Sequence, residues 1–242
     1  MFDKLAELYR DQSGVALTEL ALTAPIVLTL GLYGMESANL ALTHMRVSQA
    51  AMQIADNASR IGESSSLDTR KIYEHEIIDL FVGADLQFGT SYDLFEHGRV
   101  VLSSQEIDPD DPDEKQQYIH WQRCKGLRDF HSAYGDAGHG KGSPAFKGMG
   151  PPGQEVLALP DDAVMFVEIE YEYQPIITEA FIGDRIVSAE ASFNVRGARD
   201  LRQIYQQDPD DPVDAETCDK FDKYRTTASP RFDSEGWDWN EL

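Results

Sequence analysis

The run VALTELALTAPIVLTLGLYGM, Val15 to Met35, decides how the rest of the chain is interpreted. Its 21 residues include a single charged side chain, that of Glu19. As an α-helix the run would rise about 31 Å, which matches the roughly 30 Å hydrocarbon core of a bilayer. We therefore expect residues 15–35 to form a transmembrane helix.

Two other interpretations of this run are open. A cleaved secretory signal would use Lys4 and Arg10 as its basic start. Three acids in the same leader and the absence of small residues at the −3 and −1 positions of YGMESANLA argue against it. A buried core helix is disfavoured by the length and apolarity of the run. For a membrane span, Lys4 and Arg10 favour a cytoplasmic N-terminus. This topology predicts a single-pass protein of the inner (cell) membrane with a periplasmic or extracellular C-terminal domain.

Composition limits the partners of the chain. Its 242 residues are enough for one membrane segment and one compact domain. A net charge of −22 argues against nucleic acid and against electrostatic docking on anionic lipid. A hydrophobic fraction of 41% with 10% aromatic residues is too high for a disordered chain. Most of the chain should therefore fold, with its acidic residues on surfaces and loops.

The chain has two cysteines, Cys124 and Cys218. Outside the cytosol they can form one disulfide, whereas in a reducing compartment they would be two unrelated thiols. The membrane topology of the chain decides between these alternatives.

The N-terminal residues carry a family resemblance. SGVALTE, residues 13–19, resembles a type IV prepilin processing site, in which a membrane peptidase cuts after the glycine. The following residues, with Pro25 and a second acid at Glu36, are similar to the TadE/TadG-like pseudopilins of the tight-adherence (Flp-type) pilus. WQRCKG (121–126) and VMFVEIEYEYQP (164–175) resemble stretches in the soluble part of this family.

The resemblance implies a function and partners. It implies cleavage after Gly14 by a prepilin peptidase, which would make Val15 the new N-terminus and Glu19 the fifth residue. The protein would then be a minor pseudopilin that takes part in pilus assembly and surface adhesion through helix–helix association. Its partners would be other pilins or pseudopilins and the pilus assembly platform. The alternative is a secreted or membrane-anchored soluble binding domain, in which residues 15–35 serve only as signal or anchor.

If the resemblance holds, physical chemistry explains why a carboxylate lies at position 19 of a membrane helix. A charge deep in a bilayer is costly unless it is paired. Val15 and Glu19 are i and i+4, on one helix face, so a free α-amine on Val15 could pair with Glu19 of the same or a neighbouring subunit. Cleavage would therefore create the partner charge before lateral assembly. Pro25 removes a backbone donor and is expected to kink the helix.

Residues 36–62 continue as a helix. The apolar side chains form a seam with four- and three-residue spacing. Its members are Leu40, Val47, Ala51, Ile54, Ala58 and Ile61, with His44 in the remaining slot. Gly62 is the expected stop. The seam fits a stalk that packs on other pilins, and it fits an ordinary amphipathic helix that packs on its own domain.

Residues 67–220 predict an α+β domain with an antiparallel sheet, before an acidic tail at 221–242. We expect a helix at 69–81, a hairpin of strands in 85–95 and 98–107, and strands at 164–173 and 186–196. One sheet face should be buried against helix, leaving Glu168, Glu170 and Glu172 solvated on the other. Arg196 could meet this glutamate row across strands. The Gly- and Pro-rich stretch 130–153 predicts a long loop.

The sequence favours a protein without catalytic activity, cofactor or metal. HWQRC (120–124) lacks the further ligands of a zinc site, and no serine or cysteine lies in a nucleophile motif. The glutamate row could imitate a catalytic pair, but a solvated strand face is the better interpretation. DPDDP occurs at 108–112 and at 208–212, where clustered carboxylates could hold Ca²⁺. Both copies lack the glycine and distal glutamate of an EF-hand loop, which favours solvated acidic loops.

Overall fold

The computed structural model describes residues 13–62, 70–89, 92–197 and 199–223. The chain divides into two compact units. Unit 1 comprises the chain up to Thr43 together with Tyr173–Arg185, and unit 2 comprises His44–Glu172 and the chain from Ile186 onward. Residues 1–12 of the expected leader (1–14) and residues 224–242 of the expected acidic tail (221–242) lie outside the described residues.

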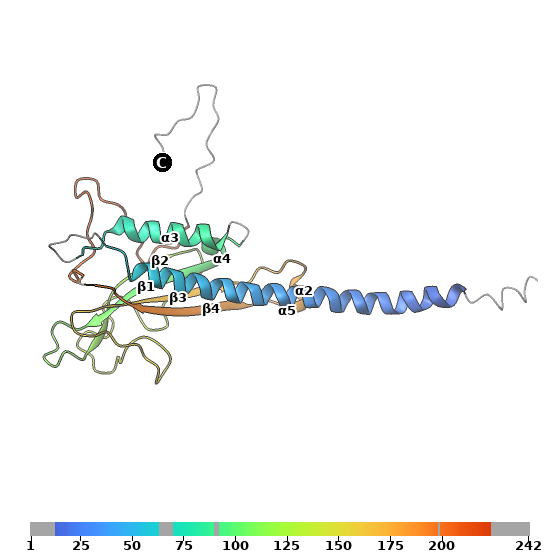
Figure 1. Ribbon diagram of the computed structural model, residues 1–242, viewed down its shortest axis with the longest axis horizontal. Coiled ribbons are helices and arrows are strands. Elements are labelled where there is room, and N and C mark those ends of the chain that lie inside the picture. Colours follow the sequence, from blue (N-terminus) through green and yellow to red (C-terminus); the bar gives the residue numbers. More distant parts are fainter. Residues whose placement is uncertain (1–12, 63–69, 90–91, 198, 224–242) are drawn as a thin grey trace, which may run out of the picture. The chain divides into compact units, whose positions relative to one another are not determined.

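One helix, α2, spans Ser13–Ala58 and continues through Pro25 (Figure 1). It includes the expected membrane segment and most of the expected stalk. Two features explain its end. The Arg199 guanidinium donates to the carbonyls of Ala58 (3.3 Å) and Ile61 (2.6 Å), so a cation caps the helix C-terminus. Gly62 follows with a φ of 123°, which favours glycine, in agreement with the expected stop.

Unit 2 contains a four-stranded antiparallel sheet in the order β2-β1-β3-β4, which confirms the α+β fold class. The strands are β1 Gly98–Ile107, β2 Gln117–Lys125, β3 Val164–Glu172 and β4 Ile186–Asn194. The expected strands at 98–107, 164–173 and 186–196 are confirmed. The sequence analysis did not assign β2, which a register shift interrupts: Ser104 pairs with Trp121 but Gln105 pairs with Ile119, leaving His120 as the extra residue.

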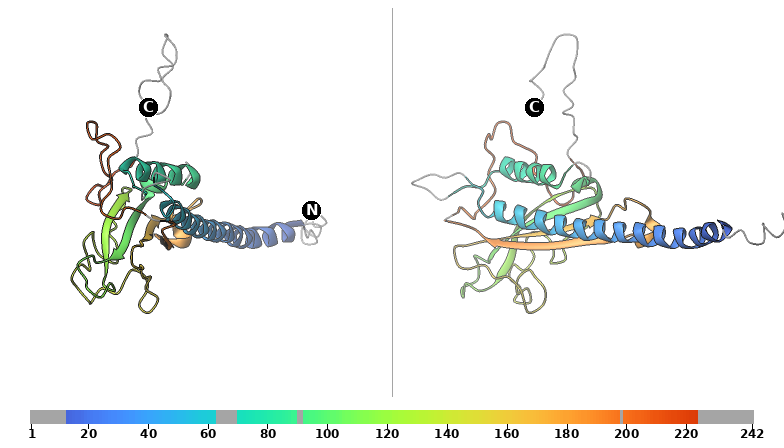
Figure 2. Two further views of the ribbon diagram at one scale, coloured as in Figure 1. Left: turned by 60° about the vertical axis from the view of Figure 1, so that its left-hand side comes forward. Right: turned by 45° about the vertical axis from the view of Figure 1, so that its right-hand side comes forward.

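Helices cover one face of this sheet. Figures 1 and 2 show α3 and the C-terminal part of α2 on the same side of the strands. The Arg123 side chain of β2 donates to the Glu74 carboxylate of α3 (Nε to Oε2, 2.9 Å). The apolar seam of α2 is buried at Val47, Ala51, Ile54 and Ala58. His44 is exposed and Leu40 is half-buried, so the expected seam is confirmed only in its C-terminal half.

The prediction for residues 69–95 was wrong in part. α3 spans Glu74–Phe88, and the short helix α4 spans Leu94–His97, so 85–95 does not form the first strand of a hairpin. The spacing of the buried side chains explains the difference, because Ile77, Phe81, Ala84 and Phe88 recur every three or four residues. The helix begins where the Glu76 carboxylate accepts the backbone N–H of Tyr73 (2.9 Å).

The other sheet face is also covered, which corrects the prediction of one solvated face. The segment 126–163 has no helix or strand, as expected for a long loop, and it lies against this face. Met149 of the loop forms a buried cluster with Ile119 of β2 and Phe166 of β3. Glu168 is only 2% exposed. Arg196 does not meet the glutamate row: its guanidinium pairs with Asp56 of α2 (3.1 Å).

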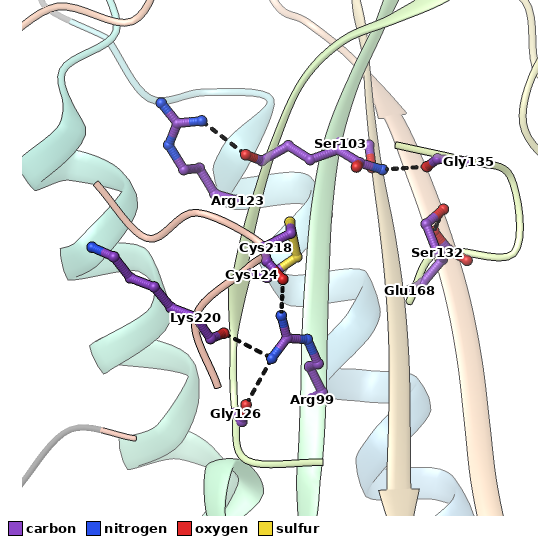
Figure 3. The surroundings of a disulfide bond; sticks show 11 residues. Arg99, Ser103, Arg123, Cys124, Gly126, Ser132, Gly135, Glu168, Cys218 and Lys220 are labelled. Carbon is purple, nitrogen blue, oxygen red and sulfur yellow. Dashed lines mark hydrogen bonds between the residues drawn. A yellow bond between two sulfur atoms is a disulfide. The ribbon is translucent and has the colours of Figure 1, made fainter. Parts of the chain in front are cut away.

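A disulfide joins Cys124 of β2 to Cys218, which confirms the bridged alternative (Figure 3). Backbone pairing holds the same segment, since the N–H of Cys124 donates to the carbonyl of Glu216 (2.8 Å). The Lys125 ammonium contacts the Glu216 carboxylate at 2.9 Å. The C-terminal segment 216–222 is therefore attached along β2 by a covalent bond, a backbone bond and an ion pair.

Arg99 reinforces this attachment from β1. Its fully buried guanidinium donates to the backbone carbonyls of Cys218 (2.7 Å), Lys220 (2.9 Å) and Gly126 (3.0 Å), as Figure 3 shows. The Phe221 ring lies against the same guanidinium, 3.8 Å from ring centroid to Cζ. The carbonyl acceptors and the aromatic face thus take the place of water around the Arg99 guanidinium. These contacts offset the cost of burying a charge in the core.

We predict that Cys124→Ser destabilises unit 2 by roughly 4–5 kcal/mol, because the bridge closes a long loop in the unfolded chain. Urea unfolding of the purified chain measures this loss. Cys218→Ser is the matched control and should cost the same, and the double variant should be no worse than either single one. Reaction of the native wild-type protein with a thiol reagent would contradict the bridge.

Candidate functional site

The most unusual surface is the N-terminal half of α2. Its large apolar side chains are exposed, including Leu17 (71%), Leu22 (72%) and Val27 (66%). By length and composition this helix can cross a membrane, and a signal sequence near an N-terminus has the same properties. Exposed apolar surface of this extent requires lipid or another protein to cover it.

The threonine hydroxyls of this run are satisfied within the helix, whereas its single carboxylate is not. The hydroxyls of Thr18, Thr23 and Thr29 donate to carbonyls three or four residues earlier, at 2.7–2.8 Å. The Glu19 carboxylate is exposed and makes no hydrogen bond or ion pair within the described chain. It is the one charged side chain of the run, and its partner has to come from outside the described chain.

The structure places Gly14, Val15, Glu19 and Pro25 on one continuous helix but brings no second charge to Glu19. A side chain built at Gly14 would meet nothing within 4 Å, so the surroundings of this residue are open. In the uncut chain the nitrogen of Val15 is a peptide nitrogen. The charge pair expected from the resemblance thus requires cleavage after Gly14.

Glu36, directly after the apolar run, lies in the opposite environment. Its side chain is fully buried within unit 1. The carboxylate accepts the Tyr173 hydroxyl and the backbone N–H groups of Ile176 (3.2 Å) and Ile177 (2.9 Å). Burial alone would raise the pKa of Glu36, but these hydrogen bonds outweigh it and hold the pKa below its usual value.

Glu36 therefore fastens the segment 173–185, here named the β3–β4 loop, to α2. The Asn39 side-chain amide donates to the Tyr173 hydroxyl (2.8 Å), which adds a second link between the same elements. The Phe181 ring of the short helix α5, Glu179–Ile182, packs edge-on against Tyr33 with ring centroids 6.0 Å apart. The sequence analysis noted Glu36 and Tyr173 separately, and no local signal linked them across 137 positions.

The glutamate row of β3 is not uniformly solvated. The Glu168 carboxylate accepts the Ser132 hydroxyl (2.6 Å) and the Ala133 backbone N–H (2.9 Å), so it ties the long loop to the sheet. Burial raises the pKa of Glu168 to about 7, and the nearby carboxylates Glu190 and Glu170 add to the rise. Because the group is sealed under the loop, this arrangement suits a structural role rather than chemistry on a substrate.

Glu170 and Glu172 are held by a residue that the sequence analysis missed. The Arg128 guanidinium contacts Glu170 at 3.2 Å and Glu172 at 3.1 Å. Arg128 follows β2 directly in the loop 126–163. The glutamate row is thus a set of attachments for this loop and not the solvated strand face expected from the sequence.

Unit 2 also has an open cleft of about 640 Å³. The bulge residue His120 lies in its wall, with Nδ1 3.0 Å from the Glu106 carboxylate. Six carboxylates line the cleft against two cationic side chains, so an anionic ligand would be repelled. The acids are Glu106, Asp108, Asp111, Glu114, Asp161 and Asp162, and the cations are Lys141 and Arg202.

The metal-like motifs are engaged in other contacts. In the first DPDDP copy, backbone N–H groups of Lys115 and Gln116 donate to Asp111 (both 2.8 Å) and hold the pKa of its carboxyl below the usual range. In HWQRC, Cys124 is in the disulfide. Within residues 13–62, 70–89, 92–197 and 199–223, no group of three potential ligands could hold a metal ion.

We predict that Glu168→Gln removes a pH dependence of stability. The folded pKa of about 7 exceeds the ordinary value of 4.5, so between these values the folded chain holds a proton that the unfolded chain has lost. Stability should therefore fall as the pH rises from about 4.5 to 7 and then level off, by on the order of 3 kcal/mol from this group. The uncharged glutamine side chain can accept the Ala133 N–H through its amide oxygen and donate its amide NH2 to the Ser132 hydroxyl oxygen.

Urea unfolding of the detergent-solubilised chain at pH 5 and pH 8 measures this effect. The variant should gain stability relative to wild type at pH 8 but not at pH 5. Glu172→Gln, at an exposed position of the same strand, is the control and should leave the difference between the two pH values unchanged. An equal pH dependence in wild type and Glu168→Gln would contradict the assignment.

Comparison of the chain with protein-family models, with curated proteins and with solved structures finds no match.

Proposed function

We propose that this protein is a membrane-anchored, pilin-like subunit that acts through association of its N-terminal helix. The single observation that carries the proposal is the lone unpaired carboxylate, Glu19, in an exposed apolar run, five residues after Gly14. A carboxylate in hydrocarbon is expensive, so its presence calls for a partner charge. Cleavage after Gly14 supplies one, the α-amine of Val15, one helical turn away.

The proposed topology is a single span at residues 15–35 with the C-terminal domain outside the cytosol. Two observations support it. The leader carries Lys4 and Arg10, and no further Lys or Arg occurs before Arg46. The bond between Cys124 and Cys218 is of a kind that persists in oxidising compartments. A prepilin peptidase and an assembly platform in the inner membrane are the corresponding partners.

The subunit would assemble laterally and carry no chemistry of its own. Small residues on α2, including Gly31 and Gly34, leave open space around the backbone, where another helix could approach closely. The Val15 amine of one subunit and the Glu19 carboxylate of the next would pair in a low-dielectric environment. We infer a role in pilus assembly and surface adhesion from this geometry together with the sequence resemblance.

A second candidate is a secreted or membrane-anchored binding domain, with residues 15–35 as signal or anchor only. The acidic cleft of unit 2 favours it, because a concave site lined by carboxylates suits a cationic ligand. The two candidates differ in the mature N-terminus. A pilin-like subunit begins at Val15, whereas a signal peptide would be removed after the apolar run.

We predict a mature N-terminus at Val15 in protein purified from its native membrane. Intact-mass and N-terminal peptide mass spectrometry measure it directly. Gly14→Leu should block cleavage and leave the chain with its leader, while Gly31→Leu, a matched change within the same helix, should be processed normally. A mature N-terminus near residue 38 would contradict the proposal and support the second candidate.

We further predict that Glu19→Ala leaves membrane insertion intact but reduces co-purification with partner pilins at least tenfold. Removal of the carboxylate leaves the new amine unpaired, and a tenfold loss corresponds to about 1.4 kcal/mol. Quantitative immunoblotting of the purified detergent extract measures the amount of partner pilin relative to the amount of this protein. Thr18→Ala is the control, because the Thr18 hydroxyl bonds only to its own helix. Undiminished co-purification of Glu19→Ala would show that charge pairing does not drive association.

A further inference from the structure

We propose that the β3–β4 loop, residues 173–185, contacts the membrane surface beside the transmembrane helix. The occupant of this surface is the headgroup and upper acyl region of the lipid. The inference rests on the proposed single span at residues 15–35. It adds a second membrane contact, made by a segment far from that span in sequence.

The first step is position. The apolar run ends at Met35, and Glu36 binds the loop backbone at Ile176 and Ile177. On the other side of this boundary, Tyr33 packs against Phe181 of the loop. Three helical residues rise only about 5 Å. The loop is therefore held at the height where α2 would leave the hydrocarbon.

The second step is the character of the side chains. Ile176 is 60% exposed although it is large and apolar, and Phe181 and Ile182 are half-buried. Tyr33 is 49% exposed, and aromatic residues with a polar tip concentrate at membrane interfaces. The exposed charged residues of the loop, Glu179, Asp184 and Arg185, can reach water or headgroups. This combination is typical of an interfacial segment.

The third step is the choice of lipid as the occupant. The loop apolar surface continues the apolar surface of α2 within the same unit, so the bilayer that covers one reaches the other. Electrostatic attraction does not contribute, because the chain is strongly acidic. The contact should therefore form in zwitterionic vesicles and be no stronger in vesicles that contain anionic lipid.

The structure offers a clean way to test this contact. Both native cysteines are in the disulfide, so an introduced cysteine is the one reactive thiol. A nitroxide is attached at Ile176→Cys in the full chain, reconstituted in phosphatidylcholine vesicles. Power saturation of the nitroxide signal with oxygen and with a water-soluble nickel chelate then reports the depth of the nitroxide in the bilayer. Leu157→Cys, 57% exposed in the long loop of unit 2, is the aqueous control, and Leu28→Cys reports the span.

We expect the ratio of oxygen to nickel accessibility at position 176 to be several-fold above that at 157 and below that at 28. Equal ratios at 176 and 157, with position 28 in hydrocarbon, would overturn the inference and leave the span intact. An aqueous signal at position 28 would instead overturn the proposed function, and the inference with it.

A second variant tests the anchor. Glu36→Ala in the Ile176→Cys chain removes the acceptor that holds the loop, so the accessibility ratio at 176 should drop toward the aqueous value. Ser37→Ala is the matched control, because the Ser37 hydroxyl bonds to the Tyr33 carbonyl of its own helix (2.8 Å). An unchanged ratio in Glu36→Ala would overturn the anchoring by Glu36.

Discussion

The described structure is built on one continuous helix, α2, whose backbone satisfies its own hydrogen bonds. A helix that needs no backbone partner can pass through different surroundings, and only its side chains must match each one. Most apolar side chains of residues 14–35 are exposed, and Tyr33 packs against Phe181. Glu36 and Asn39 bind the β3–β4 loop within unit 1, and Val47 to Ala58 fill the core of unit 2. Three roles thus follow from one element and its changing side chains.

Elements with a strict period were predictable from the sequence. The alternation at 164–173 identified β3, and the four–three spacing identified the buried positions of α2 from Val47 to Ala58. The apolar run and its single acid were also evident in the sequence. These features are local, because each depends only on the side chains within a few residues along one element. The strand β2 was missed because a bulge at His120 disrupts its alternation.

The contacts that give the glutamates their roles could not be predicted in this way. From the sequence, Glu168 was predicted to belong to a solvated row. Its burial depends on Ser132 and Ala133, which lie in a loop without periodicity. Glu36 meets Tyr173 through a contact within unit 1 that joins residues 137 positions apart in the sequence. Residues 85–88 were assigned to the first strand of a hairpin, although the spacing of the buried side chains at 77–88 is helical. Non-local packing decided the roles of the two glutamates, whereas local spacing decided the helix at 74–88.

The attachment of segment 216–222 to β2 has a consequence for biosynthesis. Cys218 follows its partner by 94 residues and lies near the end of the described chain, so the bond cannot close until almost the whole domain has been synthesised and has reached an oxidising compartment. Arg99, buried in β1, finds its carbonyl acceptors at Cys218 and Lys220 only at the same moment. Completion of the sheet edge therefore distinguishes an oxidised chain that extends through segment 216–222 from a chain truncated before it.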